Sequence, residues 1–158
     1  WVSGSHITKG AVKVNDTYFN TAKYNTPAWR NLVMCQEVGH TLGLDHQDEN
    51  FNNQNLGTCL DYTNDPSTNQ HPNQHDYDEL AIIYAHLDSV NTVFASSGNG
   101  GSNGPGRGKP EAVGEETDLN NPSAWGQALR QDKRGKNSLY ARDLGKGQKL
   151  FTFVIWVQ

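Results

Sequence analysis

The stretch Gln36–His46, with the sequence QEVGHTLGLDH, decides how this chain is interpreted. On a helix, Gln36 and His40 stand four residues apart and share one face, so their side chains can converge on a single ion. Gly43 can adopt a positive φ angle, which lets the helix end and the chain turn sharply. Because His46 can then return from the following loop, the segment predicts three metal ligands.

The residue next to the first of these ligands, Glu37, carries the chemistry. Three protein ligands leave a fourth position on a tetrahedral zinc ion for water, whose pKa falls to about 7 when bound. An adjacent carboxylate can take the proton of this water as it attacks a polarised carbonyl group. The spacing therefore predicts hydrolysis with Glu37 as general base.

This segment resembles the metzincin signature H-E-x-x-H-x-x-G-x-x-H, in particular that of bacterial matrixin-like proteins. It matches at Glu37, His40, Gly43 and His46 and departs at Gln36. The likeness extends over roughly residues 5–87 and lacks the upstream sheet and first helix of a metzincin catalytic domain. It implies a zinc-dependent endopeptidase with Gln36, His40 and His46 as the metal ligands.

A second feature of the resemblance is the sequence CLDY at residues 59–62. Metzincins carry a methionine turn beneath the metal, and some branches follow it two residues later with a tyrosine that can reach the metal. Leu60 stands in the methionine place and Tyr62 in the tyrosine place, so the likeness implies a catalytic role for Tyr62. We also expect an extended peptide to bind against an exposed edge strand near Val2–Ile7.

The glutamine leaves a second interpretation open. Its side-chain carbonyl is a neutral, hard oxygen donor that holds zinc less well than an imidazole nitrogen does. The alternative to the enzyme is thus a catalytically inactive pseudoprotease or peptide-binding module. In that case Gln36 is a spectator amide, Glu37 an ordinary helix carboxylate and Tyr62 a packing residue.

Cys35 and Cys59 are the only cysteines, and each lies beside a predicted site element. A disulfide between them would tie the helix to the turn and indicates a secreted protein, whereas free or metal-binding thiols are the alternative. Asp48, Glu49 and nearby Asn residues could hold a structural calcium ion. His71 and His75 are four residues apart and could bind a second metal, although surface or capping roles fit them better beside Pro72 and a helix start.

The remaining patterns predict an α+β fold. Its catalytic part is a partial metzincin-like domain with an edge strand, a zinc helix, a loop carrying the turn at Leu60 and a C-terminal helix. We expect the elements in this order: a strand over Ile7–Phe19, a helix over Pro27–Leu42 capped by Thr26, an irregular loop over Gln47–Asn73, a helix from about Asp76, and a small β-hairpin of residues 139–144 and 149–157 joined by Gly145–Gln148.

Composition divides the chain into a catalytic region at 1–95, a linker rich in Gly, Ser and Asn at 96–108, and a tail at 109–158. Residues 1–95 hold 4 Lys/Arg and 11 Asp/Glu, a balance of −7, and residues 96–158 hold 9 and 6, a balance of +3, which together give the net charge of −4. We therefore expect the basic tail to dock on the first region or simply to add solubility, rather than to bind a polyanion. Its strand pattern leaves a further possibility, in which the hairpin adds to the catalytic sheet or covers the cleft.

Charge and hydropathy also limit the kinds of partner that the protein can have. The acidic first part argues against nucleic-acid binding, and no apolar run approaches the roughly 20 residues that span a bilayer. We expect a secreted monomer that acts on protein or peptide substrates and does not bind a membrane.

Overall fold

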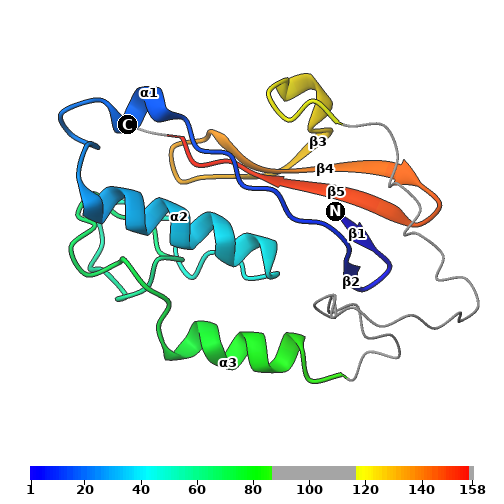
Figure 1. Ribbon diagram of the computed structural model, residues 1–158, viewed down its shortest axis with the longest axis horizontal. Helices are drawn as coiled ribbons and strands as arrows, with labels where there is room; N and C mark the ends of the chain where they lie inside the picture. Colours follow the sequence, from blue (N-terminus) through cyan, green and yellow to red (C-terminus); the bar gives the residue numbers. More distant parts are fainter. Residues whose placement is uncertain (87–116, 157–158) are drawn as a thin grey trace, which may run out of the picture.

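The computed structural model of the protein describes residues 1–86 and 117–156 and combines helices with an antiparallel sheet, which confirms the α+β class (Figure 1). The predicted linker at 96–108 lies outside these residues. In chain order the elements are β1 (Val2–Ser3), β2 (His6–Ile7), α1 (Asp16–Phe19), α2 (Pro27–Thr41), α3 (Gln74–Ile83), the short 3-10 helix η1 (Pro122–Ala124), β3 (Gln127–Gln131), β4 (Asn137–Gly145) and β5 (Gln148–Phe153).

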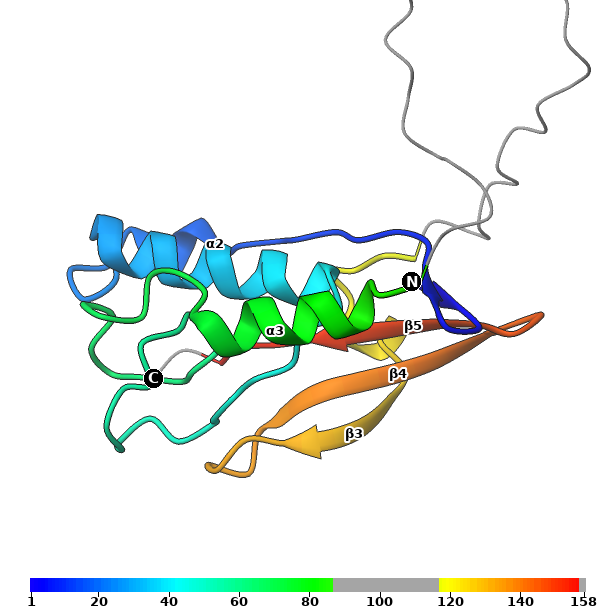
Figure 2. The ribbon, with the colours of Figure 1, turned by 90° about the horizontal axis from the view of Figure 1, so that it is seen from below.

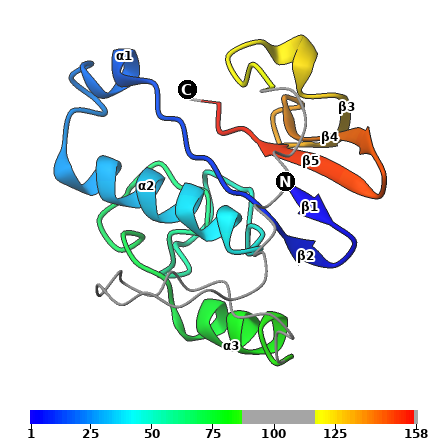
Figure 3. The same ribbon diagram turned by 45° about the vertical axis from the view of Figure 1, so that its right-hand side comes forward.

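One sheet joins the two ends of the chain. Its strand order is β2-β1-β5-β4-β3, and all neighbouring pairs are antiparallel. Strand β1 pairs with β2 on one side and with β5 on the other, so the C-terminal hairpin adds to the first strands (Figure 3). Helices α2 and α3 lie on one side of this sheet (Figure 2).

The hairpin of β4 and β5 was predicted correctly. Lys146 and Gly147 form its two-residue turn, and both have positive φ, 53° and 74°, as a type I′ turn requires. Strand β3 was not predicted, because four of its five residues are exposed and show no apolar alternation.

Helix α2 begins and ends as its sequence predicts. The Thr26 hydroxyl accepts a hydrogen bond from the Trp29 N–H at 3.3 Å, and Pro27 is the first helical residue. At the other end Leu42 is the C-cap, and Gly43 follows with a φ of 96°. The chain therefore reverses at the predicted glycine.

The predicted strand over Ile7–Phe19 is wrong. Only His6–Ile7 is paired, residues 8–15 run extended outside any strand, and α1 occupies Asp16–Phe19. The Asn15 side chain accepts from the Thr17 N–H at 3.0 Å, so Asn15 caps this short helix and ends the extended segment.

The expected edge strand near Val2–Ile7 is a tight hairpin of β1 and β2. Val2 and Ser3 are paired on both sides, by β2 and by β5. At this end of the sheet the free edge is therefore that of the two-residue β2, and the other edge of the sheet is β3.

The irregular loop over Gln47–Asn73 is held by a disulfide and by buried polar groups. Cys35 and Cys59 are bonded, as predicted, and pack in a small core with Leu44 and Leu60. The buried carboxylate of Asp76 accepts hydrogen bonds from three places, which are the Asn73 N–H, the Thr58 hydroxyl and the Gln47 amide. These bonds tie the start of α3 to both ends of the loop.

Within residues 1–86 and 117–156, no helix combines the length and the apolar character that crossing a membrane demands.

Candidate functional site

The site is built around His40 and His46, which the turn at Gly43 brings close together, with their rings nearly perpendicular. The two Nε2 atoms lie 2.9 Å apart, and the ring centroids are 4.5 Å apart. His40 is buried on the last turn of α2, and the side chain of His46 is only 1% exposed. The structure thus brings together two of the three predicted ligands.

Hydrogen bonds on the far side of each ring fix which nitrogen carries a proton. His40 Nδ1 lies 2.8 Å from the carbonyl oxygen of Leu44, and His46 Nδ1 lies 2.7 Å from Glu49 Oε1. Both partners are acceptors, so each Nδ1 must be the donor, and each Nε2 of a neutral ring presents a lone pair. Burial, and next the charge of His46, lowers the pKa of His40 to about 4, which keeps this ring neutral at pH 7.

Two lone pairs that face each other at 2.9 Å repel unless a cation or a shared proton lies between them. Imidazole nitrogen is a common zinc ligand, and a hydrogen bond from its other nitrogen to a carbonyl or carboxylate is the usual companion of such ligation. The two histidines therefore fit a metal ion.

Gln36, the third predicted ligand, lies one helical turn before His40 on the same buried face. Its side chain is almost fully buried, at 1% exposure, and its Nε2 has no hydrogen-bond partner among the described residues. A buried amide N–H without a partner is costly, so this donor suits an acceptor on a bound ligand; a metal ion would be held by the carbonyl oxygen of the same amide.

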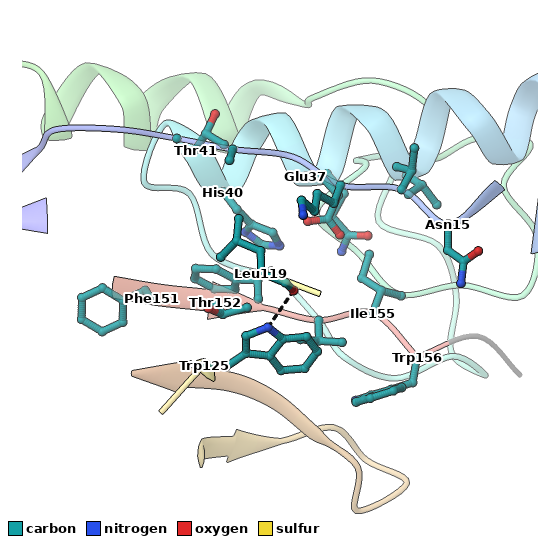
Figure 4. A pocket seen from close by; sticks show the side chains of 18 of the residues that line it. Asn15, Glu37, His40, Thr41, Leu119, Trp125, Phe151, Thr152, Ile155 and Trp156 are labelled. Carbon is teal, nitrogen blue, oxygen red and sulfur yellow. Dashed lines mark hydrogen bonds between the residues drawn. The ribbon is translucent and has the colours of Figure 1, made fainter. Parts of the chain in front are cut away.

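Glu37 lines a cavity of about 690 Å³ between α2, the extended residues 9–15 and the end of β5 (Figure 4). Its carboxylate is half-buried and makes no hydrogen bond or ion pair with the described residues. Burial raises the pKa of Glu37 to about 7, where a carboxyl group can both accept and return a proton at neutral pH.

The cavity is mainly aromatic and aliphatic, with polar atoms that lack partners. Trp125, Phe151, Ile155 and Trp156 contribute to its walls (Figure 4). Four residues that line it carry a buried side-chain atom without a hydrogen-bond partner among the described residues: Gln36 Nε2, Asp61 Oδ1, Tyr62 OH and Thr152 Oγ1. An apolar pocket with a few polar groups is typical of a ligand site.

The turn at Leu60 packs beneath the helix. Leu60 is fully buried, and its Cδ2 lies 3.3 Å from the place that a Cβ on Gly39 would take, so the glycine permits this close approach. The Tyr62 ring lies 4.5 Å from the His46 ring. Burial, followed by the charges of Glu49 and Glu37, raises the pKa of Tyr62, so its hydroxyl stays protonated and can donate.

The C-terminal sheet contributes two residues that the sequence did not reveal. Phe153 of β5 stacks on the His40 ring, with centroids 4.1 Å apart and an interplanar angle of 9°. Arg130 of β3 binds Asp45 through two hydrogen bonds of 2.7 Å. Arg130 and Asp45 are 85 positions apart in the sequence, and Phe153 and His40 are 113 positions apart. No local sequence pattern predicts contacts over such separations.

The other predicted metal sites find little support in the geometry. Asp48 accepts hydrogen bonds from the Asn50 N–H and the Asn53 amide, and Glu49 accepts one from His46 Nδ1. His71 and His75 are exposed. Residues 1–86 and 117–156 contain no group of three or more His, Cys, Asp or Glu side chains that could hold a metal.

Models of known protein families, curated proteins and solved structures were all compared with this chain, and none of the three comparisons finds a match.

Proposed function

We propose that the protein is a zinc-dependent endopeptidase with a metzincin-like site. The observation that carries this proposal is the pair of Nε2 lone pairs that meet at 2.9 Å, with Glu37 lining the same cavity as His40. Each ring is oriented by an acceptor on its other nitrogen, which is the arrangement that metal ligation needs. In the proposal Gln36, His40 and His46 hold the ion.

When bound, zinc would polarise the substrate carbonyl and lower the pKa of a water molecule. Glu37 takes the proton of that water and then donates it to the nitrogen of the departing amine. A carboxyl group with a pKa of about 7 suits both steps at neutral pH. Tyr62, which is protonated and lacks a partner within the described residues, donates a hydrogen bond to the oxygen that becomes negative.

The cavity beside Glu37 supports a peptide as the substrate. Its aromatic and aliphatic walls suit an apolar side chain, and the unpartnered polar atoms of Asp61 and Thr152 suit the groups of a peptide backbone. The disulfide supports an oxidising environment, so we place the enzyme outside the cell.

Two observations favour the second candidate, a peptide-binding module without activity. Phe153 lies flat on His40, and the ligand set contains a neutral amide in place of a third imidazole. Such a site would bind a peptide in the cavity without cutting it.

Cleavage of casein by the purified, zinc-supplemented protein tests the proposal. We expect chelator-sensitive cleavage, and we expect Glu37→Gln to lower its rate about 100-fold or more, the usual contribution of a general base. Glu79→Gln is the matched control, because Glu79 is a partly exposed carboxylate on α3 that does not line the cavity. Equal rates for Glu37→Gln and the wild type would refute the assigned mechanism, and peptide binding without cleavage would favour the module.

A further inference from the structure

Arg130 of β3 reaches the carboxylates that flank His46. Its Nη1 and Nη2 atoms donate to Asp45 Oδ2 and Oδ1, each at 2.7 Å, in the paired geometry that a planar guanidinium favours. Its Nε lies 3.1 Å from Glu49 Oε1, within ion-pair distance although outside hydrogen-bond geometry. One side chain thus holds two acidic groups.

Both of these groups in turn hold His46. Glu49 Oε1 accepts from Nδ1 of the ring at 2.7 Å, and Asp45 Oδ1 accepts from the main-chain N–H at 2.8 Å. Because the His46 side chain is only 1% exposed, water cannot replace Glu49 as the acceptor without a rearrangement. The direction of Nε2 therefore depends on where Glu49 stands.

We propose that Arg130 is a positioning residue, which keeps Glu49 against His46 and thereby aims His46 Nε2 at His40. The importance of Arg130 for catalysis rests on the proposed function. Its effect on the orientation of the His46 ring is independent of that function. Without the guanidinium, Asp45 and Glu49 would lose the Lys or Arg side chain with which they pair among the described residues, because Lys133 pairs with Asp48, and Glu49 would turn toward solvent.

The C-terminal sheet thus helps to orient the histidines of the site. Strand β3 is tied to β4, β4 to β5, and β5 to β1, so the sheet fixes the position from which Arg130 approaches. The same sheet supplies Phe153, which stacks on the other imidazole. Each histidine is thus fixed by its own segment, through the acceptor at its Nδ1, and by the C-terminal sheet, through Phe153 for His40 and through Arg130 for His46.

The test compares Arg130→Ala and Arg130→Lys with Lys133→Ala. Lys133 lies just beyond the end of β3 and pairs with Asp48 at 3.6 Å; among the described residues it forms no ion pair with Glu49 or His46, so its removal deletes one positive charge nearby without freeing Glu49. Lysine at 130 keeps the charge but cannot bridge two carboxylates in the same way, so it separates geometry from charge.

The first readout uses the metal-free protein and needs no activity. In the proton NMR spectrum we expect the protected Nδ1–H signal of His46 in the wild type and in Lys133→Ala, and its loss through exchange with water in Arg130→Ala. Arg130→Lys should weaken the signal, and because it retains the charge it serves as the decisive variant if Arg130→Ala does not fold. A wild-type signal in both Arg130 variants would overturn the proposal.

The second readout is zinc affinity, measured by competition with a chelator. We expect a loss of about 10 to 100-fold in Arg130→Ala, the usual effect of removing a group that orients a ligand, and no change in Lys133→Ala. If the NMR signal changes as expected while the wild type neither binds zinc nor cleaves casein, the positioning role stands and the proposed function fails. If the wild type cleaves casein and both Arg130 variants keep its zinc affinity, the positioning role fails alone.

Discussion

The helix-loop region, residues 26–86, and the C-terminal sheet, β3 to β5, contribute to the site in different ways. The first supplies Gln36, Glu37, His40 and His46 within eleven residues of sequence, whereas the second supplies Arg130 and Phe153 from more than 80 residues away. The groups proposed to do the chemistry are thus encoded locally, while part of what orients them comes from distant strands.

The two regions also differ in what stabilises them. The apolar core of the helix-loop region is small and consists of Leu44, Cys59 and Leu60 with a few half-buried neighbours. A disulfide and buried, hydrogen-bonded carboxylates stabilise this region in place of a larger core. The sheet depends on turn conformation and on strand pairing. Variants in the first region should therefore be the more costly.

The largest effect is expected from the disulfide. Replacing Cys35 and Cys59 by alanine should lower the free energy of unfolding by about 3 kcal/mol, because the crosslink restricts a long loop of the unfolded chain. Urea titration of the variant and of the reduced wild type measures this loss. A change below about 1 kcal/mol in both would mean that the loop is held without the crosslink.

Asp76→Asn should cost about 2 kcal/mol, because the buried carboxylate accepts from Asn73, Thr58 and Gln47, and an amide cannot accept all three bonds as well. Asp78→Asn on the same helix is the control, since Asp78 is exposed, and it should change stability by less than about 0.5 kcal/mol. Equal losses in the two variants would show that the buried hydrogen bonds of Asp76 do not contribute to the free energy of unfolding beyond what an exposed carboxylate does.

In the sheet, Asp132→Asn should cost about 1 kcal/mol at pH 7. Burial alone would raise the pKa of Asp132, but hydrogen bonds from the Lys136 and Arg134 N–H groups outweigh it and lower this pKa. A lowered pKa contributes stability above the unfolded value of about 3.9, and this contribution is lost as the pH falls through the folded pKa. Urea titrations at pH 7 and pH 3 should therefore show the difference between wild type and variant shrinking with acid, and a constant difference would contradict this account.

The smallest effect has the opposite sign. Lys146→Asn should raise the free energy of unfolding by about 0.5 kcal/mol, because Asn tolerates a φ of 53° better than Lys does and Asn-Gly is preferred in type I′ turns. Thermal unfolding measures this gain. A loss of stability would mean that the Lys146 side chain matters more than the backbone strain.

Sequence patterns foresaw those parts of the fold that have local causes. The cap at Thr26, the reversal at Gly43, the paired cysteines and the β4-β5 turn all act within a few residues or through a unique pair, and each was predicted correctly. The strand expected over Ile7–Phe19 failed because apolar alternation alone does not provide a pairing partner. The roles of Arg130 and Phe153 depend on β5 pairing with β1, which no spacing in the sequence specifies.

The zinc content of the purified protein, measured by mass spectrometry for the wild type and for His46→Ala, tests the central claim most directly. If His40 and His46 aim their lone pairs at one ion, the wild type should hold about one zinc per chain after dialysis, and His46→Ala should hold almost none. A wild type that remains free of metal, or a variant that retains the full zinc content, would contradict it.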